Sequence, residues 1–280
     1  MLAVFFLITI PISAYAVDGQ IKIAQTPSTT FPIVIDQPGS YVLTSNIVVP
    51  ATDVNGIWIK TGNVTIDFNG HTVTGPGRES GTWGNGVHHS VHGNITIKNG
   101  TVENFRGYGL DLDLCQNCQV TDMKVTENGT GGIRTFFSTI TNITALNNYN
   151  FGIDAFHSTI SNCMAYGNGD GINATSSTVT NCTTNANVGR GIAAWSSTIT
   201  NCTATLNGGD GIHAVEKSRV EGNNLRDNGG YGLYLRTLHN YAVKNTASGN
   251  TGGNFYSGDP SNYMPTSLTG PDAANANIGW

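Results

Sequence analysis

The chain has few charged residues and no excess of basic ones. Only 11% of its 280 residues are charged, and its 13 Lys and Arg are outnumbered by 18 Asp and Glu, which gives a net charge of −5. Disordered chains depend on a high charge content, and proteins that bind nucleic acid depend on basic surfaces that hold phosphates. The composition therefore excludes both classes, and we expect no nucleic-acid partner.

Long hydrophobic runs are missing beyond the start of the chain. The one such run, MLAVFFLITIPISAYA at residues 1–16, is interrupted by Pro11 and ends in Ala14-Tyr15-Ala16. It is short for a membrane span, and its small-x-small ending is typical of signal-peptide cleavage. We therefore predict a signal peptide over 1–16. The mature chain, about 17–280, should be a monomer that is secreted, periplasmic or at the cell surface, without membrane insertion.

An amphipathic pattern of helix length is also missing, and a repeat takes its place. GIDAFHSTISNCMAYGNGD (152–170), GINATSSTVTNCTTNANVGR (171–190) and GIAAWSSTITNCTATLNGGD (191–210) are versions of one unit. A period near twenty residues without helices or a leucine-rich signature predicts a solenoid of short strands. The units open at intervals of 19 to 30 residues on ten glycines: Gly56, Gly86, Gly109, Gly132, Gly152, Gly171, Gly191, Gly211, Gly232 and Gly253.

Each unit divides into three short strands separated by turns. In the unit at 191–210 these are GIAAW, TIT (198–200) and CTATL (202–206). The residue after the opening glycine is aliphatic in every unit from 56 to 235, and the alternation predicts that it points inward. An asparagine separates the second and third strands, where we expect left-handed backbone and a ladder of stacked amides. These asparagines are Asn142, Asn162, Asn181 and Asn201.

The spacing of the five cysteines does not indicate a disulfide framework. Cys163, Cys182 and Cys202 each follow a repeat glycine by eleven residues, which predicts one column of buried thiols that act as small apolar fillers. Cys115 and Cys118 form a lone C-x-x-C. A local disulfide and a chemical role both stay open for this pair, and zinc would need more ligands.

The Gly-Ile openings, the Asn in the second turn and the Asn-Gly endings resemble the right-handed parallel β-helix repeats of the pectate-lyase-like superfamily. FPIVIDQPGSYVLTSNIVV (31–49) resembles the entry segment of such helices. The resemblance implies one all-β, right-handed parallel β-helix of about ten coils with three strands per coil. We place the cap and entry strands at 17–55, the coils at 56–253 and a C-terminal cap or tail at 254–280. The same fold carries lyases, hydrolases, epimerases, phage spikes and inert stalks, so it does not by itself give an activity.

Two outward columns on the first strand combine acids, bases and aromatic rings. Such groups suit a sugar chain, which needs flat apolar platforms and acid–base groups. We predict Arg134, Asp111, Asp154 and His88 as catalytic residues. The predicted substrate-binding residues are Phe136, Phe156, Trp195, His213 and Tyr234.

The alternative for these columns is a ladder of charges that cancel one another, as expected for Asp170, Arg190 and Asp210 in the last turn. Because Arg134 points outward, we also expect that its removal strands no buried partner.

Two chemistries could use this surface. In β-elimination or C5 epimerisation of a uronan, Arg134 would neutralise the substrate carboxylate while His88 abstracts the α-proton. Inverting hydrolysis would instead pair Asp111 with Asp113 or Asp154. YGLD (108–111) and FGID (151–154) resemble the Tyr-Gly-Phe-Asp-Pro-His stretch of mannuronan C5-epimerases. This resemblance suggests Asp111 or Asp154 as the matching Asp, but the Pro-His is missing at both places.

Other functions remain open. The chain is short for an enzyme of this fold, so a non-catalytic glycan-binding or structural cell-surface module is the main alternative. A Thr-x-Thr array on the second strand, from Thr139 to Thr200, resembles some ice-binding β-solenoids. No cofactor is certain. Calcium could bind Asp111 and Asp113, which point the same way from one strand, although Arg134 would repel a cation beside it.

Overall fold

The computed structural model describes residues 19–50, 54–79, 81, 83–90, 92–266 and 276–279. The expected signal peptide at 1–16 lies outside these residues. The described residues form strands and turns, and none of them is helical. Accordingly, this part of the chain contains no helix that is long and apolar enough to cross a membrane.

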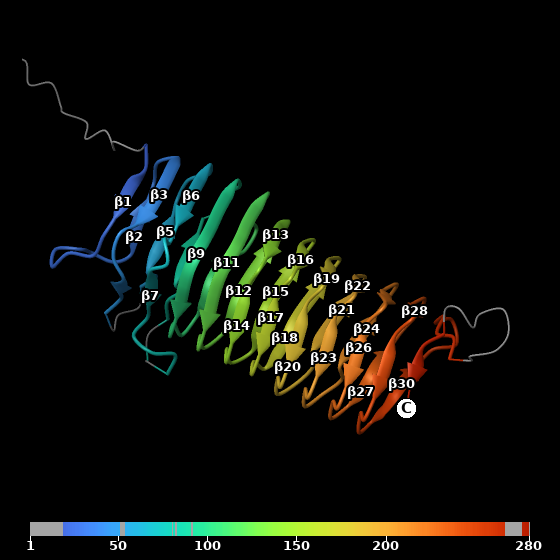
Figure 1. Ribbon diagram of the computed structural model, residues 1–280. Coiled ribbons are helices and arrows are strands. Elements are labelled where there is room, and N and C mark those ends of the chain that lie inside the picture. Colours follow the sequence, from blue (N-terminus) through green and yellow to red (C-terminus); the bar gives the residue numbers. More distant parts are fainter. Residues whose placement is uncertain are drawn as a thin grey trace, which may run out of the picture.

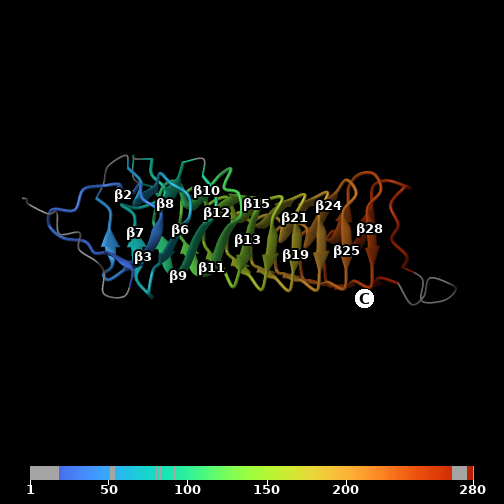
Figure 2. The same cartoon turned by 90° about the horizontal axis from the view of Figure 1, so that it is seen from above.

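Successive coils stack along one axis and form a rod (Figures 1 and 2). The first strands of the coils form one parallel sheet of eleven strands, which we call the eleven-stranded sheet. It corresponds to about eleven turns. Its strands are β2 (Ile33–Ile35), β5 (Ile57–Ile59), β8 (Val87–His89), β10 (Tyr108–Leu112), β12 (Gly131–Phe136), β15 (Phe151–Phe156), β18 (Asp170–Thr175), β21 (Ile192–Trp195), β24 (Ile212–Val215), β27 (Tyr231–Leu235) and β30 (Gly253–Ser257).

The second and third strands of the coils form the twenty-stranded sheet, which is also parallel throughout. Its strands are β1 (Ile21–Ile23), β3 (Gly39–Leu43), β4 (Ile47–Val48), β6 (Val64–Asp67), β7 (Thr72–Thr74), β9 (Ile95–Glu103), β11 (Cys118–Thr126), β13 (Ser138–Thr141), β14 (Thr144–Leu146), β16 (Thr159–Ser161), β17 (Met164–Tyr166), β19 (Thr178–Thr180), β20 (Thr183–Asn185), β22 (Thr198–Thr200), β23 (Thr203–Thr205), β25 (Arg219–Glu221), β26 (Asn224–Arg226), β28 (Tyr241–Val243), β29 (Thr246–Ser248) and β31 (Ile278–Gly279).

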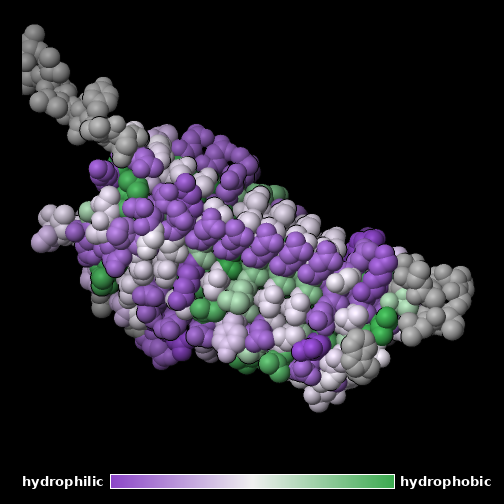
Figure 3. Space-filling model, viewed as in Figure 1, coloured by the Kyte–Doolittle hydropathy of each residue, from purple (hydrophilic) through white to green (hydrophobic). Residues whose placement is uncertain are grey.

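The predicted parallel β-helix and its register are confirmed. The residues after the repeat glycines pair rung to rung, as Ile133 does with Ile153 and Ile153 with Ile172, and all three are fully buried. The outer surface is different: the face seen in Figure 3 is covered mainly by hydrophilic and near-neutral residues in bands along the rod. The core is therefore one continuous apolar column inside the coils.

Two coils depart from three separate strands. β9 and β11 each run through the bend between the second and third strand positions, and they pair with each other on both sides of it. The bend itself is kept, because Asn99 and Asp122 still have positive φ values of 69° and 53°. At Gly100 the interior leaves no room for a side chain, since a Cβ atom would lie 2.3 Å from Cβ of Phe68.

The longest amide ladder lies in a different turn from the expected one. Asn142, Asn162, Asn181 and Asn201 have the expected left-handed backbone, with φ between 53° and 57°. Asn142, however, is exposed and donates to Asp122. A short ladder of Asn223, Asn245 and Asn277 does lie in the second turn. The longer ladder belongs to the third turn, where each Oδ1 accepts hydrogen bonds from the backbone N–H and the Nδ2 of the preceding member. This ladder comprises Asn128, Asn148, Asn168, Asn187, Asn207, Asn228 and Asn250.

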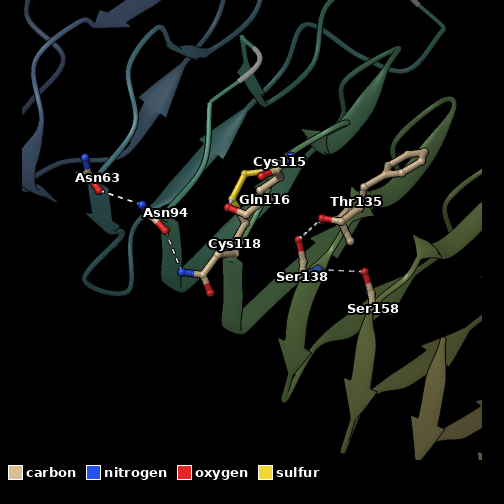
Figure 4. The surroundings of a disulfide bond; sticks show 10 residues. Asn63, Asn94, Cys115, Gln116, Cys118, Thr135, Ser138 and Ser158 are labelled. Atoms are coloured by element: carbon tan, nitrogen blue, oxygen red, sulfur yellow. Dashed lines mark hydrogen bonds between the residues drawn. A yellow bond between two sulfur atoms is a disulfide. The ribbon is translucent and has the colours of Figure 1, made fainter. Parts of the chain in front are cut away.

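The structure shows the state of all five cysteines. Cys163, Cys182 and Cys202 are free, buried and stacked as one column, as expected. Each thiol donates to a backbone carbonyl two residues earlier, at 3.2 Å. Cys115 and Cys118 form the local disulfide, one of the two roles left open, in the turn that leads into β11 (Figure 4). Both half-cystines are buried.

We predict that Asn187→Ala destabilises the protein much more than Asn162→Ala. Asn187 accepts from N and Nδ2 of Asn168, and its own amide donates to the carbonyl of Ala165 at 3.1 Å and to Asn207 at 2.8 Å. Its removal leaves buried polar groups unpaired, which costs about 1–3 kcal/mol for each group. Asn162 is exposed and supplies mainly its left-handed backbone. Thermal unfolding followed by circular dichroism measures both, and equal losses would contradict the prediction.

We also predict an acid sensitivity that arises from His89. This side chain points into the interior, is 3% exposed, and has no hydrogen-bond partner at either ring nitrogen. Burial lowers its pKa below the ordinary value of 6.5. Protonation is thus easier in the unfolded chain, so His89 should cost stability as the pH falls below about 6.5, by up to roughly 1.4 kcal/mol per pH unit.

The variant His89→Leu isolates this effect. Its melting temperature should fall less than that of the unmodified protein between pH 7 and pH 5. Parallel curves for the two proteins would show that His89 is not the sensitive group.

Candidate functional site

The predicted surface column lies on the outer face of the eleven-stranded sheet. His88 on β8, Asp111 on β10, Arg134 on β12 and Asp154 on β15 occupy successive rungs of one register. Neighbouring strands of a sheet lie about 4.8 Å apart. Four groups that are up to 66 residues apart in the sequence therefore become neighbours, as the repeat alignment predicted.

Asp111 is the centre of this cluster. Its side chain faces outward, yet the residue is only 4% exposed because its neighbours cover it. One carboxylate oxygen accepts from Nε of Arg134 at 2.9 Å and lies 2.9 Å from Nη2 of the same guanidinium. The other accepts from Nδ2 of Asn85 at 3.1 Å and lies 3.2 Å from Nδ1 of His88. We call these four residues the Asp111 cluster.

The charges of the Asp111 cluster support one another. Burial alone would raise the pKa of Asp111, but its contacts with His88 and Arg134 outweigh burial and lower that pKa below the ordinary value. Burial likewise works against the charge of Arg134, while the carboxylate of Asp111 raises the pKa of the guanidinium. Asp111 is thus ionised at neutral pH and fixes the position of both neighbours.

Asp154 has the opposite electrostatic environment. It is 6% exposed and accepts a hydrogen bond from Nδ2 of Asn173 at 2.6 Å. Burial raises its pKa, and the negative charge of Asp113 adds to that rise against the influence of Asn173 and Arg134. Two carboxyl groups of one column therefore differ in their readiness to hold a proton. Such a difference is the usual mark of an acid and a base with separate tasks.

Tyr108 is a site residue that the sequence analysis missed. Its ring centroid lies 4.9 Å from Cζ of Arg134, and burial together with the charge of Asp154 raises the pKa of its hydroxyl. The signal was present, since Tyr108 opens the YGLD stretch that resembles the epimerase sequence. It was overlooked because only the columns two and four residues after each glycine were considered, and Tyr108 precedes its glycine.

The residues proposed for calcium do not fit a cation. Nη2 of Arg134 lies 2.9 Å from Asp111 and 3.4 Å from Asp113, so the guanidinium already bridges the two carboxylates. A cation bound to both would have to displace this positive charge. In the described part of the chain, no three or more His, Cys, Asp and Glu side chains are grouped so that they could hold a metal ion.

The predicted aromatic residues fall into two groups. Phe136 and Phe156 lie next to the Asp111 cluster on β12 and β15, and their rings stack at 4.4 Å with an angle of 10°. Both are partly exposed. The rings thus form a flat platform beside Arg134.

The other predicted binding residues lie further along the rod. Trp195 lies two rungs beyond Phe156 and 5.8 Å from the guanidinium of Arg190, which is itself paired with Asp170. His213 is 8% exposed and held by Asp210 at 2.9 Å, so it does not face an open groove. Tyr234 packs edge-on against its ring. The structure does not bring these three residues into contact with the Asp111 cluster.

The position of Arg134 corrects one expectation from the sequence. Its outward orientation predicted that removal would strand no buried partner, but the carboxylate of Asp111 is buried and depends on it. Asp111 faces outward but is buried because Asn85 covers it. Asn85 lies three residues before His88, on the preceding rung, and donates to the carboxylate of Asp111.

We therefore predict that Arg134→Ala destabilises the protein at pH 7 by about 1–3 kcal/mol, the cost of a buried charge that loses a partner. Because the pKa of Asp111 is lowered in the folded protein, this stability is present above the unfolded value of 3.8 and is lost as the pH falls through the lower folded value. The deficit of the variant should shrink accordingly in acid. Arg134→Lys keeps the charge and should lose less stability than Arg134→Ala. Melting curves from pH 3 to 8 provide the measurement. An unchanged melting temperature of Arg134→Ala at pH 7 would argue against the role of Asp111 as the centre of the cluster.

Comparisons with known proteins agree with the fold. A family model described as a right-handed β-helix region matches residues 55–198, just over half of the chain. Among curated proteins, none has a significantly similar sequence. Two similar solved structures are the A-modules of the mannuronan C-5 epimerases AlgE4 and AlgE6 from Azotobacter vinelandii. Their TM-scores are 0.57 and 0.56 at 16% and 14% identity, and in both cases 94% of this chain aligns with 89% of the module.

The Dettilon tailspike protein is also similar, with a TM-score of 0.64 and 15% identity. Here 93% of this chain aligns with 61% of the tailspike chain, so it spans about three-fifths of that protein. Identities this low show a common fold and nothing about activity. The match of the family model over more than half of the sequence shows that this chain belongs to the right-handed β-helix family.

Proposed function

We propose that this protein is an exported enzyme that acts on an acidic, uronate-containing polysaccharide by removing the proton at C5. The products would be those of β-elimination or of C5 epimerisation. One observation carries the proposal. The buried carboxylate of Asp111 holds a histidine and an arginine side by side, and the side chains of His88 and Arg134 are each about one third exposed, at 33% and 32%.

Arg134 has the properties needed to bind the substrate carboxylate. A guanidinium carries five N–H donors in a planar fork. Asp111 contacts Nε and Nη2, and Asp113 lies 3.4 Å from Nη2, which leaves the two N–H groups of Nη1 for a further acceptor. The remaining donors would bind a uronate carboxylate. Neutralisation of that carboxylate makes the neighbouring C5 proton more acidic and stabilises the negative charge that develops in the transition state.

His88 is placed to act as the base. Donation of Nδ1–H to Asp111 fixes the tautomer and leaves the lone pair of Nε2 directed away from the carboxylate. A buried carboxylate that orients a histidine is the arrangement by which many enzymes stabilise the imidazolium formed on proton transfer. His88 and Arg134 flank Asp111 on either side, so one sugar unit above Asp111 could meet both.

Asp154 is the proposed proton donor. Burial raises its pKa, which favours the protonated form. In elimination the C5–H and C4–O4 bonds break, the C4=C5 bond forms, and the proton from Asp154 goes to the leaving O4. In epimerisation the proton would return to C5 from the face opposite His88. Tyr108, whose pKa is also raised, is a second group that could deliver the proton.

The same geometry is less suited to inverting hydrolysis. That reaction needs one carboxylate free to activate water. Both oxygens of Asp111 are occupied by Arg134, Asn85 and His88, so this residue cannot serve. A neutral sugar would also leave Arg134 without a substrate carboxylate to bind. The stacked rings of Phe136 and Phe156 would contact the apolar face of a neighbouring sugar in either case.

The substrate class is consistent with the relatives, two of which are named as epimerases of mannuronan. The export part of the proposal rests on the sequence at residues 1–16, and secretion of a tagged full-length chain tests it. The catalytic proposal requires an activity assay.

We predict that incubation with uronans gives either a rise in absorbance near 235 nm, from an unsaturated product, or a change of C5 configuration visible by proton NMR. His88→Ala should lower the rate by roughly 10²–10⁴-fold, because a positioned general base contributes that much. His157→Asn is the matched control, since His157 is exposed, has a left-handed backbone that Asn tolerates, and stacks on Phe137 away from the cluster.

A flat absorbance trace, with neither epimerised product nor release of reducing sugar, would contradict the proposal. Retained binding of uronan under those conditions would instead support a non-catalytic glycan-binding module.

A further inference from the structure

A hollow lies outside the Asp111 cluster, on the edge where third strands turn into first strands. It consists of two adjoining cavities of about 790 and 360 Å³ that share Arg78, Tyr149 and Asn150. Residues Thr130 and Asn150 of its lining directly precede β12 and β15. The hollow therefore opens beside the strands that carry Arg134 and Asp154.

The hollow is built by the longest interval of the repeat. The 30 residues from Gly56 to Gly86 include an extended connection between β7 and β8. From this connection Nη1 of Arg78 donates to the backbone carbonyl of Asn147 at 3.3 Å, 69 residues further along the chain. Asn147 follows β14, three rungs from β7, so the connection reaches roughly 14 Å along the rod. Its residues Arg78, Glu79 and Trp83 line the smaller cavity.

The smaller cavity combines aromatic rings with guanidinium groups. Cζ of Arg106 lies 5.4 Å from the centroid of the Trp83 ring, and the side chain of Tyr149 adds a second ring that is 70% exposed. Arg78 contributes the second guanidinium. Of the described residues in this lining, only Glu79 is acidic, and its side chain is 86% exposed and 3.8 Å from Nε of Arg78.

This combination matches the needs of an acidic sugar. An aromatic ring offers an apolar face for a pyranose, and a guanidinium fork binds a carboxylate. The described residues of the smaller cavity contribute two guanidinium groups and one exposed carboxylate, an excess of positive charge, although the protein as a whole has a net charge of −5.

An aromatic surface connects the hollow to the Asp111 cluster. A Cβ atom on Gly131 would lie 2.8 Å from Cε1 of Tyr108, so the Tyr108 ring rests against this glycine. On its other side the same ring contacts Arg134. Phe151 pairs with Gly131 on the next rung and is partly exposed. From Thr130 to Arg134 the strand covers about 13 Å, a distance that a short oligosaccharide can bridge.

We propose that the smaller cavity is an accessory subsite that binds a uronate unit of the same acidic polysaccharide, a few sugars away from the reacting unit. The carboxylate of that unit binds Arg106 and Arg78, and its ring lies against Trp83 or Tyr149. The substrate chain then lies over β10 and β12 and runs parallel to these strands. The identity of the ligand rests on the proposed function.

The test compares substrates of different length. For the unmodified protein, kcat/KM should rise between uronate trimers and octamers, because only the longer oligomers reach both sites. In Arg106→Ala the ratio of octamer to trimer kcat/KM should fall about tenfold, since a charge-assisted hydrogen bond contributes that much or more. Tyr149→Ala removes a ring contact with the sugar instead and should also lower this ratio. Arg226→Ala and Tyr166→Ala are matched controls, because both residues are exposed on the third strands β26 and β17 and outside the cavity lining.

The outcomes separate this inference from the proposed function. Loss of the length ratio in the cavity variants and its retention in the controls would support the subsite. An unchanged ratio, or an equal loss for trimers and octamers, would overturn it while the catalytic proposal stands. If the protein binds uronans without turnover, the ratio of the calorimetric Kd values for trimer and octamer replaces the ratio of kcat/KM values. The same comparison between cavity variants and controls then tests the subsite. If the unmodified protein binds no uronan of either length, the subsite is overturned as well.

Discussion

The fold depends on the way each coil satisfies the polar groups of its buried third turn. A coil of about twenty residues makes three turns, and the third places backbone N–H and C=O groups where water cannot reach them. In the third turn the buried asparagine ladder solves this problem, because one side-chain oxygen accepts from the backbone and the amide of the preceding coil. The six amides from Asn148 to Asn250 also donate to strand carbonyls, as Asn187 does to Ala165. The hydrogen bonds fix not only the turn but the register of each coil on the next.

The strict register between coils brings side chains that are distant in the sequence together on one surface. Because coils stack without slipping, the residue two positions after each opening glycine falls above the same position of the next coil. His88, Asp111, Arg134 and Asp154 become contiguous without any loop to bring them together. The rigid interior under them, made of residues such as Ile133 and Leu110 at 0% exposure, holds these groups in fixed geometry. A surface of this kind needs no closing lid to place its charges.

The periodicity of the sequence was sufficient to predict the fold, the inward columns, the buried cysteines and the neighbours of Arg134. Each of these follows from a position within the repeat. The features that could not be predicted depend on departures from the repeat or on side-chain directions. The contact of Arg78 with Asn147 comes from an insertion that has no counterpart in other coils. The burial of Asp111 and Asp154 depends on how Asn85, Asn173 and Tyr108 lie over the column. The alternation of a strand shows which residues face outward, but not which of those are covered.

Asp111 and Asp154 show why the covering side chains matter more than the column. Both are aspartates at equivalent positions of the repeat, both face outward, and both are almost fully buried. Burial by itself raises the pKa of each. Asp111 receives Arg134 and His88 in addition and is ionised, whereas Asp154 receives the neutral amide of Asn173 and remains easier to protonate. Arg134 lies between them in the register but turns its guanidinium toward Asp111 and Asp113. That one choice of partner makes two identical side chains unequal, since Asp111 is a fixed anion and Asp154 is easier to protonate. It also explains how a repeat with little charge can produce an asymmetric site: the backbone supplies identical positions, and a single arginine makes them unequal.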